Sequence, residues 1–138
     1  MMENISKHIT FKEATFSATA QRLGIKNEPT LDHLKSMITV SEKCFEPLRE
    51  WYGKPLRINS FYRGKDLNNA VKGSATSQHC KGEAIDIDAG SVAENKKIHD
   101  WIKDNLDFDQ LINEYNYSWV HVSYTDKKPN RKQLVTIK

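Results

Sequence analysis

The sequence predicts an α+β fold, with N-terminal helices packed on a small, mainly antiparallel sheet. Two observations support this prediction. In residues 31–52, apolar side chains recur at the three- and four-residue spacing of one helix face. In residues 84–89 and 119–123, apolar and polar residues alternate, as in a strand with one buried face. Helices therefore come first and most strands later, an order typical of α+β domains.

The chain has 138 residues, which fits a single domain over residues 1–138. An apolar fraction of 38% and a charged fraction of 28% are those of an ordinary globular protein. The net charge of +3 comes from scattered Lys and Arg, so we expect no nucleic-acid partner. We also expect no membrane partner, because no apolar run is long enough to span a bilayer. A monomer is the expected state.

The N-terminal residues 1–10 lack the apolar segment of a secretory signal. We therefore expect a protein made in the cytoplasm without an export signal of its own. Cys44 and Cys80 are then expected to be free, buried thiols and not a disulfide.

Capping patterns predict where the first two helices begin and end. Thr10 and Glu13 form a capping-box pattern, which predicts one helix over residues 11–23 that ends at Gly24. The next helix is the clearest element of the chain and covers residues 31–52.

Thr30 can cap this second helix, and Gly53 can end it. Pro47 lies inside it and lacks a backbone N–H, so we expect a kink or a division near this residue.

The rest of the chain reads as shorter elements. In order, we expect a strand over residues 56–61, a short helix over 65–71, a polar loop over 73–79, a strand over 84–89, a helix opened by a second capping box at Ser91 and Glu94, and a hairpin that pairs 109–115 with 118–124. In the 84–89 strand, Ile85 and Ile87 should face the core, and Asp86 and Asp88 the opposite side.

His79 and Asp86 are the first candidates for chemistry. Six residues separate them, and Gly82 lets the chain between them turn and approach closely. A catalytic zinc site needs three protein ligands and one open position for water. A lone Asp of this kind is more often a surface carboxylate on an edge strand.

His121 adds a third candidate ligand. In the alternating strand over residues 119–123, Val120 and Val122 face one way while Trp119, His121 and Ser123 face the other. Taken alone, such a histidine is more often structural than a metal ligand.

Hairpin geometry brings Glu114 into the argument. If the loop after residue 114 or 115 has an even number of residues, Glu114 lies opposite Trp119 and shares its face with His121. Zinc lowers the pKa of a bound water to about 7, and a nearby carboxylate can accept its proton.

Motifs from five parts of the chain carry a resemblance to a known family. They are Ser17, Thr19, Ala20, Arg22, Gly24, Ile25, Asn27 and Pro29; Asn59 to Arg63 with Leu67 and Asn68; Ser77, His79, Gly82, Ala84 and Asp86; Asp109 to Ile112 with Glu114; and Trp119 to Ser123. With these motifs the sequence resembles the zinc D-alanyl-D-alanine carboxypeptidase family, which includes the vancomycin-resistance dipeptidases and phage cell-wall endopeptidases. It is most similar to the small carboxypeptidase-like branch of phages and prophages. The resemblance covers about residues 8–124.

The resemblance implies one zinc ion per chain on His79, Asp86 and His121, and Glu114 as the catalytic base. Several family members place their acidic base three residues before the last histidine, where this chain has Ser118. Arg63 would bind a substrate carboxylate or stabilise the developing oxyanion.

The resemblance further implies that Ser77 and Gln78 hydrogen-bond the substrate and that Trp119 forms a wall of the cleft. The implied activity is hydrolysis of a peptide bond next to a D-amino acid in peptidoglycan, so the expected partner is a peptidoglycan peptide. A phage or prophage enzyme would act on the wall after release or from a phage particle.

Two other functions remain open at this point. One is a non-catalytic module of the same superfamily whose zinc only supports the fold. The other is a non-haem iron oxygenase, which also uses two histidines and a carboxylate but usually spaces one His and the carboxylate a single residue apart. Outside the site, His33 and His99 lie on expected helices and should be solvated. His8 is not expected to be a metal ligand.

Overall fold

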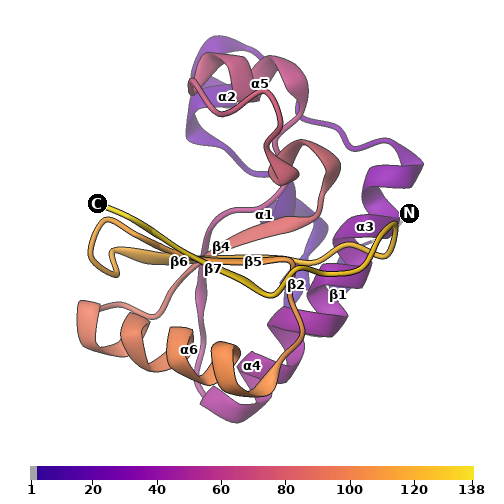
Figure 1. The fold of residues 1–138 in the computed structure, drawn as a ribbon. Helices are drawn as coiled ribbons and strands as arrows, with labels where there is room; N and C mark the ends of the chain where they lie inside the picture. The colour runs from indigo at the N-terminus through magenta and orange to yellow at the C-terminus, as the bar shows by residue number, and fades with distance from the viewer. Residues whose placement is uncertain (1–2) are drawn as a thin grey trace.

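The computed structural model describes residues 3–138 and confirms the α+β class (Figure 1). The helices are α1 (Phe11–Thr15), α2 (Ala18–Leu23), α3 (Leu31–Val40), α4 (Glu46–Tyr52), α5 (Lys65–Ala70) and α6 (Val92–Asn105), with a π-helical segment η1 (Ser41–Phe45) and a 3-10 turn η2 (Gln78–Lys81). The strands are β1 (Asn4–Ser6), β2 (Ile9–Thr10), β3 (Arg57–Ser60), β4 (Ala84–Asp88), β5 (Gln110–Glu114), β6 (Trp119–Ser123) and β7 (Gln133–Ile137).

The central sheet has the strand order β3-β4-β6-β5-β7, and β1 and β2 form a separate short hairpin. All neighbours in the central sheet are antiparallel except β5 and β7, which run parallel. Helices α4 and α6 lie on one side of this sheet, and α2 and α5 lie on the other side (Figure 1). Within residues 3–138, no helix is both long and apolar enough to cross a bilayer.

One face of the sheet forms the core together with the helices that cover it. The alternation predicted for β4 is confirmed, because Ile85 and Ile87 are fully buried on this face. They pack with residues from the other strands, from the helices and from the loop after α6: Leu111, Val120, Val122, Met37, Val40, Phe45, Leu48, Ile98, Ile102 and Phe108. Burial of the strand side chains fixes the register of the sheet, since a shift of one strand by one residue would turn its apolar side chains to the opposite face.

The capping box at Thr10 and Glu13 is confirmed: each side chain bonds the backbone N–H of the other residue. The single helix over residues 11–23 is wrong. The chain turns to extended geometry at Phe16, and the Ser17 hydroxyl caps α2 by accepting from the backbone N–H of Ala20. A serine that bonds its own downstream backbone competes with a continuous helix, which explains the break.

The long helix starts at Thr30 and ends at Gly53, as predicted. Its interruption is the π-helical segment η1, which directly precedes α4 and Pro47. A proline ring clashes with the carbonyl four residues earlier in an α-helix, and the wider π turn lies at that place.

Several side chains differ from expectation. Ser91 caps α6, but the Glu94 carboxylate accepts from the Tyr52 hydroxyl instead of closing the second capping box. His99 is buried against Asp100 and Tyr117 and is not solvated, because α6 turns this face toward the β5–β6 hairpin. His33 is also only half exposed, because its ring nitrogen lies 3.1 Å from the Tyr62 hydroxyl.

The two cysteines are free thiols. Cys44 is buried as expected, and burial raises the pKa of its thiol to about 12, so it stays protonated. Cys80 is only half buried.

Candidate metal centre

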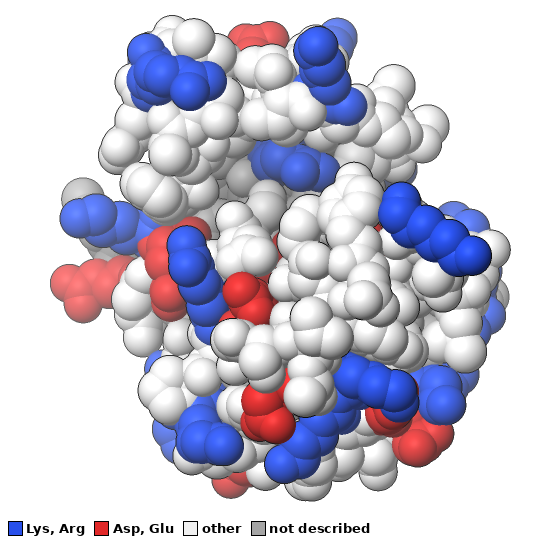
Figure 2. Space-filling view, turned by 90° about the vertical axis from the view of Figure 1, so that its left-hand side faces the viewer, with Lys and Arg blue, Asp and Glu red and all other residues white. Residues whose placement is uncertain are grey.

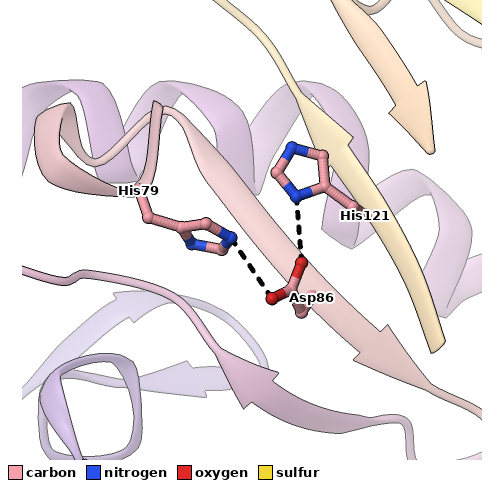
Figure 3. Close-up of side chains that lie close together, drawn as sticks. All are labelled: His79, Asp86 and His121. Atoms are coloured by element: carbon pink, nitrogen blue, oxygen red, sulfur yellow. Dashed lines mark hydrogen bonds and ion pairs between the residues drawn. The ribbon is translucent and has the colours of Figure 1, made fainter. Parts of the chain in front are cut away.

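Three side chains from separate segments meet on the face of the sheet opposite the core. His79 comes from η2, Asp86 from β4 and His121 from β6, and they point toward one another (Figure 3). Asp86 and His121 are direct cross-strand partners, which places both on one face. One potential ligand atom from each residue lies within 4.8 Å of the others. All three side chains are at least nine-tenths buried.

The imidazole of His79 is held with Nε2 toward the other two residues. Its Nδ1 lies 2.7 Å from the carbonyl oxygen of Phe61, and a carbonyl can only accept, so Nδ1 carries the proton. In a neutral ring, Nε2 then directs a lone pair at the Asp86 carboxylate, 3.2 Å away. That contact becomes favourable when a second proton or a cation lies between the two groups.

Gly82 lets the segment between His79 and Asp86 turn, as the sequence predicted, and the structure places this turn against α3. Its φ is +73°, and a Cβ at this position would lie 2.5 Å from the backbone oxygen of His33. The turn therefore requires glycine both for its dihedral angle and for space.

Asp86 is the charged centre of the cluster. Burial opposes its ionisation, but the charge on His79 and hydrogen bonds from His121 and His79 hold the pKa of Asp86 well below its usual range. The Oδ1 atom lies 3.0 Å from Nδ1 of His121. A buried carboxylate stays ionised here only because positive charge lies beside it, and a divalent cation bound by the same three residues would supply that charge.

The hairpin between β5 and β6 has the even loop required to bring Glu114 to this face. Glu114 pairs directly with Trp119, and Ile112 pairs with His121. The indole N–H of Trp119 donates to the Glu114 carboxylate at 2.7 Å. Glu114, Trp119 and all three clustered residues line one cleft of about 850 Å³.

Arg63 lines the same cleft from the segment after β3. Its backbone N–H donates to the carbonyl of His79, and Nη2 lies 3.4 Å from the Ser77 hydroxyl. Its Nε is buried and has no partner among residues 3–138, and no carboxylate of those residues forms an ion pair with this guanidinium. A half-buried cation of this kind is suited to bind an anionic group of a ligand.

Ser77 and Gln78, which were also named from the sequence, line the same cleft, but their side chains form different hydrogen bonds. Ser77 accepts from the backbone N–H of His79 and so helps to fix η2. Gln78 donates its side-chain N–H to Asp109 at 3.1 Å, while its amide oxygen is buried without a partner in residues 3–138.

Sequence reasoning missed one wall of this cleft. Lys127, Lys128 and Arg131 line it from the segment between β6 and β7, and Lys72 and Lys81 line it from elsewhere in the chain. Arg131 binds the buried carboxylate of Asp109 with two hydrogen bonds, at 3.0 and 2.8 Å. No local pattern signals this pair, since 22 positions separate its members.

The donor set fits zinc. Two imidazoles and one carboxylate are zinc ligands, and three protein ligands leave the open position that distinguishes a catalytic from a structural site. Cys80 does not join the cluster in residues 3–138, so the cluster offers no fourth protein ligand. The hydrogen bond from His79 to the Phe61 carbonyl is the outer contact that orients a zinc-binding imidazole.

The family model described as Peptidase M15 matches residues 7–123, which is most of the chain. The match includes every cleft residue discussed above that lies before the end of β6. No curated protein matches the chain.

Proposed function

The chain belongs to the peptidase M15 family, whose members are zinc metallopeptidases, and from this premise we propose that it hydrolyses a peptide bond next to a D-amino acid in the stem peptides of bacterial peptidoglycan. The observation that carries the proposal is the convergence of His79, Asp86 and His121 in one cleft with Glu114. The three would hold the metal, and the fourth would supply the base that hydrolysis needs.

Each residue of the cleft then has a task in the reaction. His79, Asp86 and His121 would hold zinc, which supplies Lewis acidity for the carbonyl and lowers the pKa of water. Glu114 would accept a proton from the attacking water and return it to the leaving amine. The Trp119 indole N–H holds the Glu114 carboxylate in one orientation for this task.

Arg63 would act on the substrate. Its unpaired guanidinium suits either the terminal carboxylate of a D-residue or the negative charge that develops on the carbonyl oxygen. Ser77 would fix that guanidinium through its hydroxyl, and Trp119 would form the wall of the cleft beside the bond that is cut.

Digestion of purified peptidoglycan tests this function, with the released peptides identified by mass. Loss of a single D-residue would indicate a carboxypeptidase, and release of cross-linked fragments would indicate an endopeptidase. Glu114→Gln keeps the size of the side chain but cannot accept the proton, so turnover should fall roughly 100-fold. Zinc content and thermal stability should stay near those of the unmodified protein.

The control is Glu50→Gln, which removes an exposed carboxylate of α4 outside the cleft. It should leave turnover within the error of the measurement. Turnover of Glu114→Gln equal to that of the control would exclude Glu114 as the base.

One observation favours a second function. Ser118 occupies the place where several family members carry their acidic base, and a serine cannot perform this role. A peptidoglycan-binding module without activity would explain it. Zinc-loaded protein that binds peptidoglycan and releases no peptide would support this second function over the first.

A further inference from the structure

The end of the cleft opposite Glu114 is built by a segment outside the family match. The match ends at residue 123, and Thr125, Lys127, Lys128 and Arg131 all come after it. Asp109 and Thr125 lie at the starting end of β5 and the finishing end of β6, while Glu114 lies at the hairpin end. His121, paired with Ile112, lies between the two ends.

The length of the strands sets the reach of this cleft. Glu114 is five positions after Asp109, and a strand rises about 3.3 Å per residue, so the two ends lie roughly 17 Å apart. An extended peptide of about five residues has the same length. A substrate lying along β5 and β6 would therefore reach from the base to this end of the cleft.

The backbone that carries Lys127 and Lys128 is fixed at both sides. Before them, Thr125 and Asn130 exchange two hydrogen bonds of 3.0 Å, and the Thr125 hydroxyl accepts from the N–H of Lys127. After them, Arg131 is held by Asp109 through its backbone N–H and its guanidinium. The loop therefore presents both lysines from a defined position.

The acidic side chains of the cleft are held by other side chains, whereas its two loop lysines pair with none of these acidic groups in residues 3–138. Its carboxylates are engaged: Asp86 faces two histidines, Asp109 is bound by Arg131, Glu114 accepts from Trp119, and Glu83 is buried beside Gln78. Among the described residues, Lys127 forms one ion pair, with its exposed neighbour Asp126 at 3.6 Å. Within residues 3–138, Lys128 forms no ion pair. Figure 2 shows Lys and Arg side chains at the back and around the mouth of the hollow between the α2–α5 part and the sheet.

We propose that Lys127 and Lys128 form a subsite for a carboxylate on the part of the substrate N-terminal to the bond that is cut. The inference rests on the proposed function and on the first of the two roles given there to Arg63: if Arg63 binds the terminal carboxylate, the rest of the peptide must leave along another part of the cleft. The substrate class is then a stem peptide with a free acidic side group, in preference to the same peptide with that group amidated.

The test uses two synthetic peptides that end in D-Ala-D-Ala and differ only in one upstream carboxylate, free or amidated. Affinity of the zinc-loaded Glu114→Gln protein for each is measured by calorimetry, and turnover is measured with the unmodified protein. The free carboxylate should bind about fivefold more tightly, as expected for a partly exposed ion pair. The preference should shrink in high salt.

In Lys127→Gln/Lys128→Gln the ratio of the two affinities should fall to within twofold of unity. The control with the same charge change, Lys35→Gln/Lys103→Gln, alters α3 and α6 outside the cleft and should keep the fivefold preference. Three results would each overturn the proposal. They are equal affinities for the two peptides when Lys127 and Lys128 are both present, no binding of either peptide, and an unchanged preference in Lys127→Gln/Lys128→Gln.

The two proposals fail in different ways. Preferential binding without cleavage of either peptide would contradict the hydrolase and leave the subsite supported. Cleavage of both peptides with equal efficiency and equal affinity would support the hydrolase and contradict the subsite.

Discussion

Strands β4 and β6 present two faces of opposite character, one residue apart. On one face Ile85, Ile87, Val120 and Val122 are fully buried among apolar side chains. On the other face Asp86 and His121 are almost as deeply buried, but they are polar and hydrogen-bond each other at 3.0 Å. The same backbone alternation positions both sets.

The polar face depends on the core face, but the core face does not depend on the polar face. Burying a carboxylate and two imidazoles costs free energy unless charge compensates it. Burial of apolar side chains on the core face stabilises the strands by roughly 25 cal/mol per Å² and fixes their register. The core face can therefore form without the metal, whereas the polar face keeps its geometry because the core face exists.

The largest effect should come from removing a ligand on the polar face. His121→Ala and His79→Ala are expected to lose zinc and to lower turnover roughly 1,000-fold, since the metal contributes several kcal/mol to the reaction. Elemental analysis gives the zinc content. His8→Ala, which changes a histidine paired with Glu46 away from the cluster, should keep one zinc per chain. Full zinc in both ligand variants would refute the assignment.

The corresponding experiment removes a side chain from the core face of strand β4. Ile87→Ala should lower the free energy of unfolding by about 3 kcal/mol, because a buried aliphatic side chain leaves a cavity. Urea unfolding of metal-free protein measures this without the contribution of bound zinc. Val92→Ala, at a position 51% exposed, is the control. If the metal-free protein showed no cooperative unfolding transition, the independence of the core face from the metal would be wrong.

A smaller effect is expected from loosening the base on the polar face. Trp119→Phe keeps an aromatic ring beside Tyr115 and removes the N–H that donates to Glu114. Turnover should fall about tenfold with little change in KM, because a less well oriented base slows the chemical step. Trp51→Phe on the far helices serves as the control. Unchanged kcat in Trp119→Phe would show that Glu114 needs no such support.

The smallest effect concerns the pair at the edge of the cleft. The hydrogen bond from Arg131 lowers the pKa of Asp109. A carboxyl with a lowered folded-state pKa stabilises the protein above its ordinary pKa, and that contribution is lost as pH falls through the folded value. Arg131→Gln should thus shift the acid-unfolding midpoint, followed by circular dichroism, to higher pH. Lys103→Gln should not shift it; equal midpoints in both would contradict the role of Arg131.

Local patterns in the sequence predicted the strands that bear Asp86 and His121, whereas the 3-10 turn that bears His79 was expected as a loop. Alternation around Asp86 and His121 gave the correct faces, and the even hairpin loop gave the register of Glu114. The caps at Thr10, Thr30 and Ser91 were also found, since a cap needs only a few neighbouring residues.

What escaped prediction depends on contacts between distant segments. Strand β7 contains Val135, Thr136 and Ile137, which favour strands, but its exposed pattern shows no alternation, and its parallel partner β5 is 23 residues away. The short hairpin of β1 and β2 was missed because its strands are too short to show a period. The basic end of the cleft depends on where residues 125–131 return to Asp109, which composition does not reveal.

The π-helical segment η1 has a consequence for how this chain can tolerate change. An α-helix advances about 100° per residue, and a π turn takes up one extra residue, so that the helix before it and the helix after it keep the same faces. Upstream, Met37 and Val40 point into the core, and downstream Leu48 does so as well. Glu42 and Lys43 are exposed, so substitution there should be nearly silent. Deletion of either one would let an ordinary α turn replace the wide turn and should leave Leu48 in the interior, so the chain can lose one residue here without turning α4 away from the core.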